Sequence, residues 1–299
     1  MIELFDAPKH SDLIYDVGMH KGEDSKFYLE KGFRVVGIEA DPILAKHCRD
    51  LFKDYIAAGR LTVIEGAIVD PLSAAGVQKV TFFRNDMLSV WGTIDVNWVQ
   101  RNVKKGTSSS PIEVNVIDFA SILIQHGIPH YMKIDIEGLD MTCVRTLRQF
   151  RQRPNYISIE SDKNNYSSIQ LEIDTLVELG YDGFQAIEQS AIPYSQTPPR
   201  PAREGIYKEH YFEKGSSGLF GKELGGEYIS RRSILCKYRL IRLGYYLVGD
   251  DGVVNKQLKF RGAKRLRSFI IRILGSWLNA TVPGWYDTHA KHSSIKNLA

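Results

Sequence analysis

The chain has 299 residues, of which 43% are hydrophobic and 25% charged, so it can bury one large core or two small ones and is not disordered. Its first residues lack a basic segment followed by an apolar run, and no later stretch approaches about 18 uncharged apolar residues, which predicts a cytoplasmic protein without a membrane span. Lys and Arg outnumber Asp and Glu by 19 to 8 in residues 200–299, whereas acidic residues outnumber basic ones by 27 to 20 before them. An acidic body therefore precedes a basic tail.

In chain order, apolar runs alternate with helix-like segments through residues 13–187. We predict a strand at 13–17, a helix at about 22–31, a strand at 34–39 and a helix from Pro42 toward residue 52. Further strands are predicted at 61–65, 80–83, 112–116, 156–160 and 183–187, with helices at 118–124, 139–150 and 169–179. This alternation predicts a mainly parallel sheet with helices on both faces.

Residues 84–111 interrupt the pattern, because their apolar residues show no periodicity. Long irregular stretches inside compact domains are often binding loops or lids, and the alternative is a solvated insertion. Three cysteines, Cys48, Cys143 and Cys236, stand far apart and outside any CxxC pattern, so we expect buried free thiols rather than disulfides or a zinc site.

The first strand, turn, helix and second strand have the layout of a nucleotide-binding βαβ unit. Glu39 follows Gly18 by 21 positions, close to the spacing at which a carboxylate accepts hydrogen bonds from an adenosine ribose. His20 and Glu23 stand where a dinucleotide fingerprint has glycines, and no P-loop is present. The acidic surroundings favour an adenosine ligand with a positive centre over NAD, FAD or ATP.

A second cluster of charged residues follows position 132. If a strand continues through it, Lys133, Asp135 and Glu137 share one face, and Gly138 then turns the chain into a helix. Glu160 ends the next predicted strand, so the carboxylates are expected at one rim of the sheet, where open α/β sheets bind ligands. The alternative is a Lys133 salt bridge that only satisfies the strand end.

These motifs resemble the FkbM family of S-adenosylmethionine-dependent methyltransferases. The resemblance covers about residues 11–190 and is carried by Asp16-Val17-Gly18 with Gly22, by Glu39, by Gly66-Ala67 and above all by Lys133-Ile134-Asp135-Ile136-Glu137-Gly138. It implies a Rossmann-like class I methyltransferase fold: a seven-stranded, mostly parallel sheet whose last strand is antiparallel, plus a basic C-terminal extension. We expect a core at 1–192 and an extension at 193–299 that packs on it and could cover the substrate site.

The resemblance also implies a cofactor site for S-adenosylmethionine. Its residues are Asp16, Gly18 and Gly22 on the methionine side, with His20 in place of the pattern's middle glycine, Glu39 at the ribose, and Ala40, Asp41, Gly66 and Ala67 around the adenine.

Methyl transfer is an in-line displacement at carbon, so an alcohol acceptor benefits from positioning and from a base. Asp135 is the first candidate base, Glu137 the second and Glu160 the third. Asp135 could instead bind the cofactor's ammonium or a divalent metal, although we do not favour a metal. The expected activity is O-methylation of a sugar, a glycan or a natural product; a dehydrogenase and a non-catalytic adenosine-binding or membrane-associated scaffold are the alternatives.

The basic tail offers two further features. Residues 258–278 repeat apolar side chains at helical spacing among basic ones, which is typical of a helix that lies on an anionic membrane, binds a partner or packs on its own sheet. The small residues from Gly215 to Gly221 form a loop that could close over a substrate, although such loops are usually only flexible. No nucleic-acid motif is present, and the sequence does not predict the oligomeric state.

Overall fold

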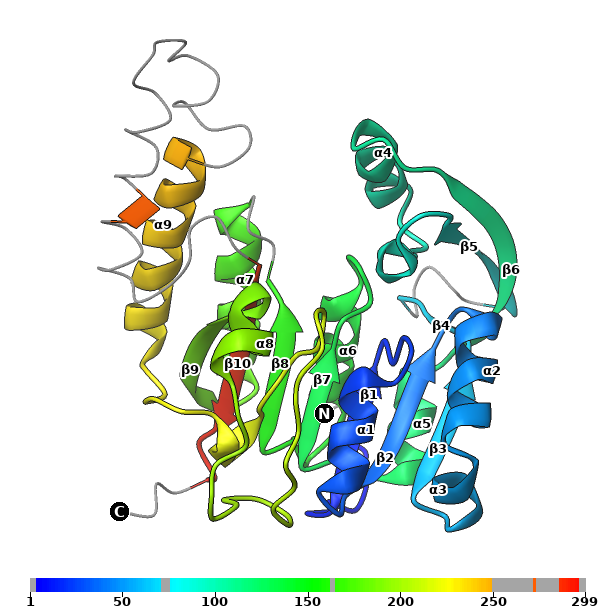
Figure 1. Ribbon diagram of the computed structural model, residues 1–299, viewed down its shortest axis with the longest axis horizontal. Coiled ribbons are helices and arrows are strands. Elements are labelled where there is room, and N and C mark those ends of the chain that lie inside the picture. The colour runs from blue at the N-terminus through cyan, green and yellow to red at the C-terminus, as the bar shows by residue number, and fades with distance from the viewer. Residues whose placement is uncertain (1–3, 71–75, 162–164, 249–270, 273–284, 296–299) are drawn as a thin grey trace.

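The computed structural model describes residues 4–70, 76–161, 165–248, 271–272 and 285–295. Its main sheet has seven strands in the order β3-β2-β1-β7-β8-β10-β9 (Figure 1). The strands are β1 (Leu13–Val17), β2 (Arg34–Glu39), β3 (Leu61–Glu65), β7 (Tyr131–Ile134), β8 (Tyr156–Glu160), β9 (Tyr181–Glu188) and β10 (Tyr286–His292). The first five strands in this order, β3, β2, β1, β7 and β8, pair in parallel with their neighbours. Strand β10 pairs antiparallel with both β8 and β9. The predicted seven-stranded sheet with an antiparallel last strand is therefore confirmed.

The strand order reverses direction at β1. From β1 the chain steps outward to β2 and β3, and it later returns to place β7 on the other side of β1. In open α/β sheets, ligands bind in the crevice that such a reversal leaves at the carboxyl ends of the strands. The carboxyl ends of β1, β2 and β7 are thus the first place to look for a site.

Helices cover both faces of the sheet, as predicted. The side chains of Ile14 and Val35 pack into the core with α1 (Glu23–Glu30) and α2 (Pro42–Leu51), whereas Tyr15 and Val17 pack into a second core on the opposite face. The helices of that second face are α5 (Phe119–His126), α6 (Asp140–Thr146), α7 (Tyr166–Glu178) and α9 (Arg231–Val248). Short helical segments complete the described chain: α3 (Lys53–Ala57), η2 (Leu147–Gln149), η3 (Gln189–Ala191), α8 (Ile192–Ser195) and η4 (Gly221–Glu223).

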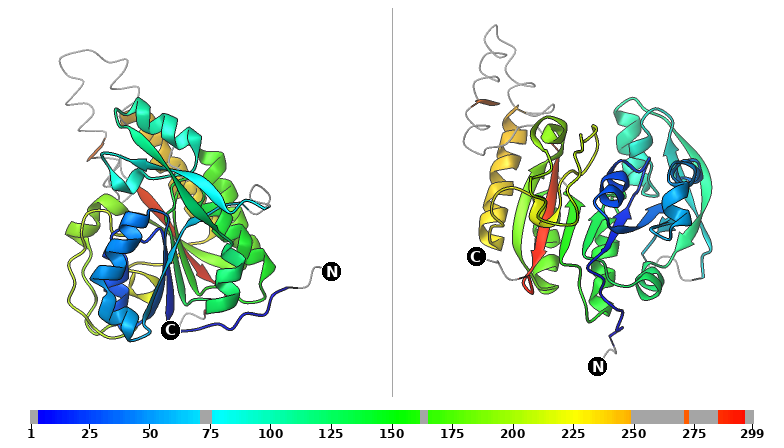
Figure 2. Two further views of the ribbon diagram at one scale, coloured as in Figure 1. Left: turned by 90° about the vertical axis from the view of Figure 1, so that its right-hand side faces the viewer. Right: turned by 60° about the horizontal axis from the view of Figure 1, so that its bottom comes forward.

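Residues 79–117 form a small substructure that we call the cap. It contains β5 (Lys79–Asn85), η1 (Ser89–Trp91), α4 (Val96–Lys104) and β6 (Ser109–Ile117), and β6 also pairs with the short β4 (Ala67–Ile68). Figures 1 and 2 show the cap beyond the carboxyl ends of β2 and β3. Residues 84–111 were expected to be irregular. This expectation is wrong for α4, for the end of β5 and for the start of β6. The segment between β5 and α4 is a loop that contains only the single helical turn η1.

Several of the described residues beyond 192 are built into the core. Strand β10 lies between β8 and β9, so the predicted boundary at residue 192 does not mark the end of the sheet. On the face of α1, Phe212, Phe220 and Leu224 are buried in its core. Beside them, Lys31 and Glu223 form a fully buried ion pair of 2.7 Å.

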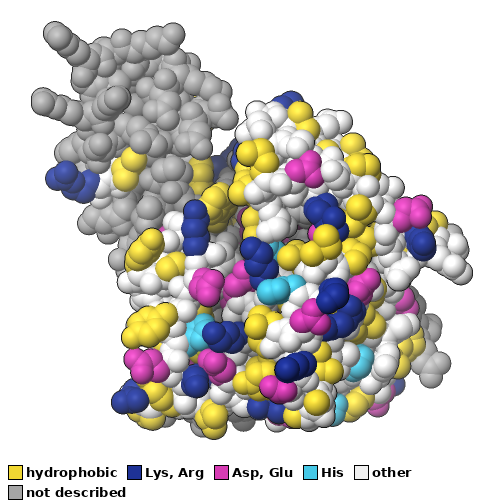
Figure 3. Space-filling view, turned by 45° about the vertical axis from the view of Figure 1, so that its right-hand side comes forward, with side chains coloured by type: hydrophobic (Ala, Val, Ile, Leu, Met, Phe, Trp, Pro, Cys, Tyr) yellow, Lys and Arg dark blue, Asp and Glu magenta, His cyan; other side chains and the backbone are white. Residues whose placement is uncertain are grey.

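The predicted amphipathic segment at 258–278 lies outside the described residues except for Ile271 and Arg272. Within the described ranges, no helix combines the length and apolar character needed to cross a membrane. Cys48 and Cys143 are buried free thiols as expected, but Cys236 is exposed. On the face in Figure 3, the basic and acidic side chains of the described surface are interspersed.

Candidate active site

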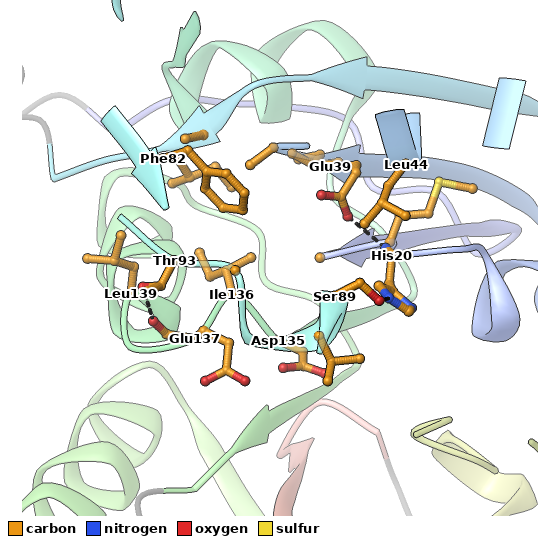
Figure 4. A pocket seen from close by; sticks show the side chains of 18 of the residues that line it. His20, Glu39, Leu44, Phe82, Ser89, Thr93, Asp135, Ile136, Glu137 and Leu139 are labelled. Carbon is orange, nitrogen blue, oxygen red and sulfur yellow. Dashed lines mark hydrogen bonds between the residues drawn. The ribbon is translucent and has the colours of Figure 1, made fainter. Parts of the chain in front are cut away.

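A pocket opens at the carboxyl ends of β1, β2 and β7, beneath the cap. Two thirds of the residues predicted for the cofactor and catalytic sites line it: Gly18, His20, Glu39, Ala40, Gly66, Ala67, Asp135 and Glu137. In Figure 4, Phe82 and Glu39 lie on one side of this pocket, and Asp135 and Glu137 lie on the other.

Four predicted residues do not line this pocket. Asp16 is buried beneath it, where it accepts a hydrogen bond of 2.6 Å from Ser25 Oγ. Gly22 precedes α1 in the left-handed conformation, and Asp41 caps α2 by accepting from the Ile43 N–H. Glu160 lines a separate cavity on the far side of the turn that follows β7.

Glu39 is held at the end of β2 by two backbone donors. Its Oε2 accepts from the His20 N–H at 2.7 Å, and its Oε1 accepts from the Asp41 N–H at 2.8 Å. Burial nevertheless raises the pKa of Glu39 to about 7, although both donors lower it. The side chain is thus fixed in direction, and its charge changes near neutral pH.

Lys133 joins β7 to the turn after β1. Its Nζ donates to the Gly18 carbonyl oxygen at 2.7 Å and forms a salt bridge of 3.2 Å with Asp16. Burial alone would lower the pKa of Lys133, but Asp16, Asp135 and Asp24 raise it well above its ordinary value. Lys133 therefore remains charged and fixes the strand ends, and it also lines the pocket.

Strand β7 ends at Ile134, so the strand does not continue through Glu137 and the side-chain alternation considered for that case does not apply. Residues 135–139 form a tight turn instead, in which Glu137 has a φ of +48°. Asp140 stabilises this turn by accepting from the Ile136 and Gly138 N–H groups at 2.9 and 3.3 Å. The turn brings both Asp135 and Glu137 to the pocket. In a continued strand they would also have shared one face, because side chains two residues apart point the same way.

The two carboxylates of this turn differ in environment. Asp135 is 30% exposed and lies 3.8 Å from the Lys133 ammonium. Burial and the nearby Glu160 and Asp135 raise the pKa of Glu137 well above its ordinary value, although Arg101 opposes this from 3.7 Å. The surroundings of Glu137 therefore favour its neutral form.

His20 ties the turn after β1 to the cap. Its backbone is left-handed, with a φ of +52°, a conformation that favours glycine but that histidine adopts more often than most other residues. The ring lies between two partners, with Nδ1 3.0 Å from Glu23 Oε1 and Nε2 2.8 Å from Ser89 Oγ. His20 therefore contributes a contact across the pocket that a glycine could not.

The cap supplies pocket residues that the sequence analysis missed. Phe82 lines the pocket together with Ser89 and Thr93, and Thr93 Oγ1 donates to the Glu137 carbonyl oxygen at 2.9 Å. Gly92 packs so closely on Phe82 that a Cβ there would lie 2.4 Å from the ring. Phe82 falls in a predicted strand, but nothing in its pattern shows which cavity that strand faces.

Apolar side chains also line the pocket near Glu39. Leu44, Ala67 and Phe82 offer flat or small surfaces of the kind that pack against a purine. In the part of the chain that the structure describes, no group of three or more His, Cys, Asp or Glu residues is placed to hold a metal ion.

The solved structures that are similar to this chain include three methyltransferases. A solved FkbM methyltransferase from Methylobacillus flagellatus KT is similar at 20% identity, with a TM-score of 0.30, over 52% of this chain and only 34% of that chain. A methyltransferase from Archaeoglobus fulgidus has 11% identity and a TM-score of 0.37 over 95% and 87% of the two chains. One from Thiobacillus denitrificans, solved with S-adenosyl-L-homocysteine, has 8% identity and a TM-score of 0.33 over 95% and 86%.

No curated protein matches the sequence. The model of the methyltransferase FkbM domain matches residues 16–182, a span that contains both motif clusters and runs from the end of β1 through β8. Since this match covers more than half of the chain, the protein belongs to the FkbM family of S-adenosylmethionine-dependent methyltransferases, as its motifs predict.

Proposed function

We propose that this protein binds S-adenosylmethionine in the pocket beneath the cap and transfers the methyl group to a hydroxyl of a sugar, a glycan or another hydroxylated metabolite. The observation that carries the proposal is one pocket with carboxylates at two ends. Glu39 lies at the end of β2, and Asp135 and Glu137 lie across the pocket after β7. One end suits a ribose, and the other suits an acceptor hydroxyl.

The residues present suit an adenosine with a positive centre. The Glu39 oxygens each accept one backbone hydrogen bond and keep capacity for the hydroxyl hydrogens of a ribose. Phe82 and Leu44 offer an apolar place for the base, and the acid-rich side around Asp135 attracts a positive charge. The positions of His20 and Glu23, where a dinucleotide site needs glycines, oppose NAD.

When bound, the cofactor supplies an electrophilic methyl group on a positively charged sulfur. The chain's own part in this transfer would be to take up the proton of the acceptor hydroxyl, a role that we assign to a carboxylate oxygen of Asp135. The Asp135 carboxylate lies 3.8 Å from the Lys133 ammonium, and it is 30% exposed, so an acceptor can reach it. Glu137 is the second candidate because its surroundings favour the protonated form, and Glu160, in the neighbouring cavity, is the third.

The test combines binding and transfer. Calorimetry on the purified protein should show binding of S-adenosylmethionine and S-adenosylhomocysteine but not of NAD. Incubation with methyl-tritiated S-adenosylmethionine and a panel of sugars and polyols should then give a labelled product that survives mild alkali, as a methyl ether does and a methyl ester does not. Binding of NAD alone would overturn the cofactor assignment, and an alkali-labile product would overturn the acceptor class.

A further inference from the structure

A loop of the extension lies at one end of the pocket beneath the cap. Gly215 lines this pocket together with Asp24 of α1 and Lys133 of β7. The next residue, Ser216, lines a separate cavity on the exposed side of α1. The backbone that joins Gly215 to Ser216 therefore separates the two cavities. The matched methyltransferase domain ends at residue 182, so this part of the pocket comes from outside that domain.

The loop is fastened to α1 by a buried carboxylate. The Ser217 backbone nitrogen lies 3.0 Å from each oxygen of Asp24 and donates its hydrogen to this carboxylate, and both residues are buried. Two residues later, the Leu219 N–H donates to Gln196 Oε1 at 2.7 Å. Loops of small residues are usually flexible, but these contacts hold this loop in one position against the pocket.

Aromatic packing fixes the chain that follows the loop. Phe220 is fully buried, and its ring stacks on that of Tyr131, with 4.9 Å between the ring centroids. It also packs edge-on against Tyr28 and Phe27 of α1. The end of the loop is thus part of the core, and the loop cannot move far from α1 without disturbing these rings.

The end of the pocket beside this loop is rich in carboxylates. Among the described residues that line the pocket, Lys133 is the only lysine or arginine, and its Nζ lies 4.0 Å from Asp24 and 3.8 Å from Asp135. Burial raises the pKa of Asp24 to about 7, although Lys133 opposes this. A second cation beside Asp24 would stabilise its ionised form, so this end of the pocket favours a guest with a positive group.

The positions of the other pocket residues give the direction of the cofactor. Glu39 ends β2, and Phe82 lies on the same side of the pocket, opposite Asp135 (Figure 4). With the ribose at Glu39 and the base against Phe82, the aminoacyl group of the cofactor extends toward β1 and β7. Asp24 and Lys133 line that end of the pocket, so the cofactor's ammonium would come close to a carboxylate.

We propose that residues 215–217 form the end wall of the cofactor pocket and that Asp24, which this loop holds, binds the ammonium of the cofactor's aminoacyl group. This inference rests on the proposed function, because it needs S-adenosylmethionine in this pocket. It assigns part of the cofactor site to the extension. Asp24 is a binding residue here, whereas Gln196 is a positioning residue that acts through Leu219.

The test compares S-adenosylhomocysteine with methylthioadenosine, which has the same adenosine and sulfur but no aminoacyl group. Calorimetry on the full chain should show that the wild type binds S-adenosylhomocysteine at least about tenfold more tightly. Asp24→Ala removes both the charge and the acceptor that holds the loop. It should weaken S-adenosylhomocysteine binding at least about tenfold and change methylthioadenosine binding by less than about threefold.

Gln196→Ala loosens the loop without changing a residue that lines the pocket. It removes the acceptor of the Leu219 N–H and should weaken S-adenosylhomocysteine binding roughly fivefold, with no change for methylthioadenosine. Asn165→Ala is the matched control, since it also removes a side-chain amide oxygen, which accepts from the Ser167 N–H at 3.0 Å at the start of α7 on the other face of the sheet. This control should leave both affinities unchanged.

The two ligands separate the possible outcomes. Equal losses for both ligands in Asp24→Ala, an unchanged S-adenosylhomocysteine affinity in Gln196→Ala, or equal wild-type affinities for the two ligands would each overturn the inference. A wild type that binds neither ligand overturns the proposed function itself. Urea denaturation shows whether each variant is folded, and if Asp24→Ala is not, the comparison between Gln196→Ala and Asn165→Ala decides.

Discussion

The backbone after β7 occupies the space that a side chain at position 18 would need: a Cβ built on Gly18 lies only 1.9 Å from the Asp135 carbonyl oxygen. Gly18 also has a φ of +82°, which other residues rarely adopt. Gly18→Ala should therefore abolish S-adenosylhomocysteine binding and lower the free energy of unfolding by about 3 kcal/mol or more. Gly106→Ala is the control, since Gly106 has a φ of +85° with nothing within 4 Å, and it should cost only about 1–2 kcal/mol in urea denaturation. Equal losses for the two variants would contradict the steric account.

Glu39 should make cofactor affinity depend on pH. Its pKa is raised from 4.5 to about 7 in the folded protein, so the folded state binds the extra proton more tightly than the unfolded state does. The stability of the unliganded protein should consequently fall as pH rises from about 4.5 to about 7, by up to roughly 3 kcal/mol from this group. Because the ionised carboxylate accepts the ribose hydroxyls, S-adenosylhomocysteine affinity should instead fall as pH drops below 7.

Glu39→Gln is the matched variant for this pH dependence. It should bind S-adenosylhomocysteine more weakly than the wild type at pH 8, and the component of pH dependence due to Glu39 should disappear from both calorimetry and urea denaturation. Asp24 and Asp140 also have raised pKa values, so the difference between wild type and variant is the quantity to compare. Parallel pH profiles for the two proteins would rule out Glu39 as their source.

Asp135→Asn should separate chemistry from binding. As the proposed base, Asp135 should contribute about 10²–10⁴-fold to turnover, while S-adenosylhomocysteine affinity changes only a few-fold. Glu137→Gln should have a smaller effect, and Asp182→Asn, on the exposed start of β9, none. If Asp135→Asn instead abolishes cofactor binding with no separate effect on turnover, the residue binds the cofactor and is not the base.

The contact between His20 and Ser89 should slow cofactor release. Ser89→Ala removes the hydroxyl that lies 2.8 Å from His20 Nε2, and a lost hydrogen bond of about 1 kcal/mol corresponds to roughly a fivefold faster dissociation of S-adenosylhomocysteine. Stopped-flow displacement measures this rate. Ser108→Ala, which removes a hydroxyl bonded to Asp86 elsewhere in the cap, should leave the rate unchanged. A rate equally affected by both changes would point to loosening of the whole cap.

The Lys31–Glu223 pair should be essential to the packing of the extension. Lys31→Met leaves the Glu223 carboxylate buried without its positive partner, at a cost of about 3–5 kcal/mol in the free energy of unfolding. Arg148→Met breaks an exposed pair with Glu178 and should cost less than about 1 kcal/mol. Adding Glu223→Gln to Lys31→Met should recover part of the loss. Similar urea midpoints for the two single variants would show that the burial of the pair is unimportant.

Most of the sheet was predictable because its strands are short apolar runs between clear turn signals. The exception is β10, in which Asp287, Thr288 and His289 are buried despite their polarity. Their polar atoms are partly satisfied by specific partners, such as Tyr238 and Ser161 for Thr288, and such partners cannot be read from a local pattern. A polar strand in the middle of a sheet is therefore invisible to a search for apolar periodicity.

The site was predictable where chain geometry alone fixes it. Gly18 and Glu39 meet because a βαβ unit brings its strand ends together, and Asp135 joins them because β7 neighbours β1. Phe82 and Ser89 could not be assigned, since the cap's placement over the sheet depends on long-range packing. Asp16 and Asp41 do not line the pocket, because their side chains interact with Ser25, Lys133 and the start of α2.

The position of β10 also sets the order in which the molecule can be completed during synthesis. Strands β8 and β9 emerge from the ribosome early, yet each keeps an unpaired edge until residues 286–292 arrive to fill the gap between them. Open edges of this kind readily pair with other chains. A polypeptide that lacks β10 thus leaves β8 and β9 without the strand that pairs with both of them, and it should aggregate more readily than the chain that contains β10.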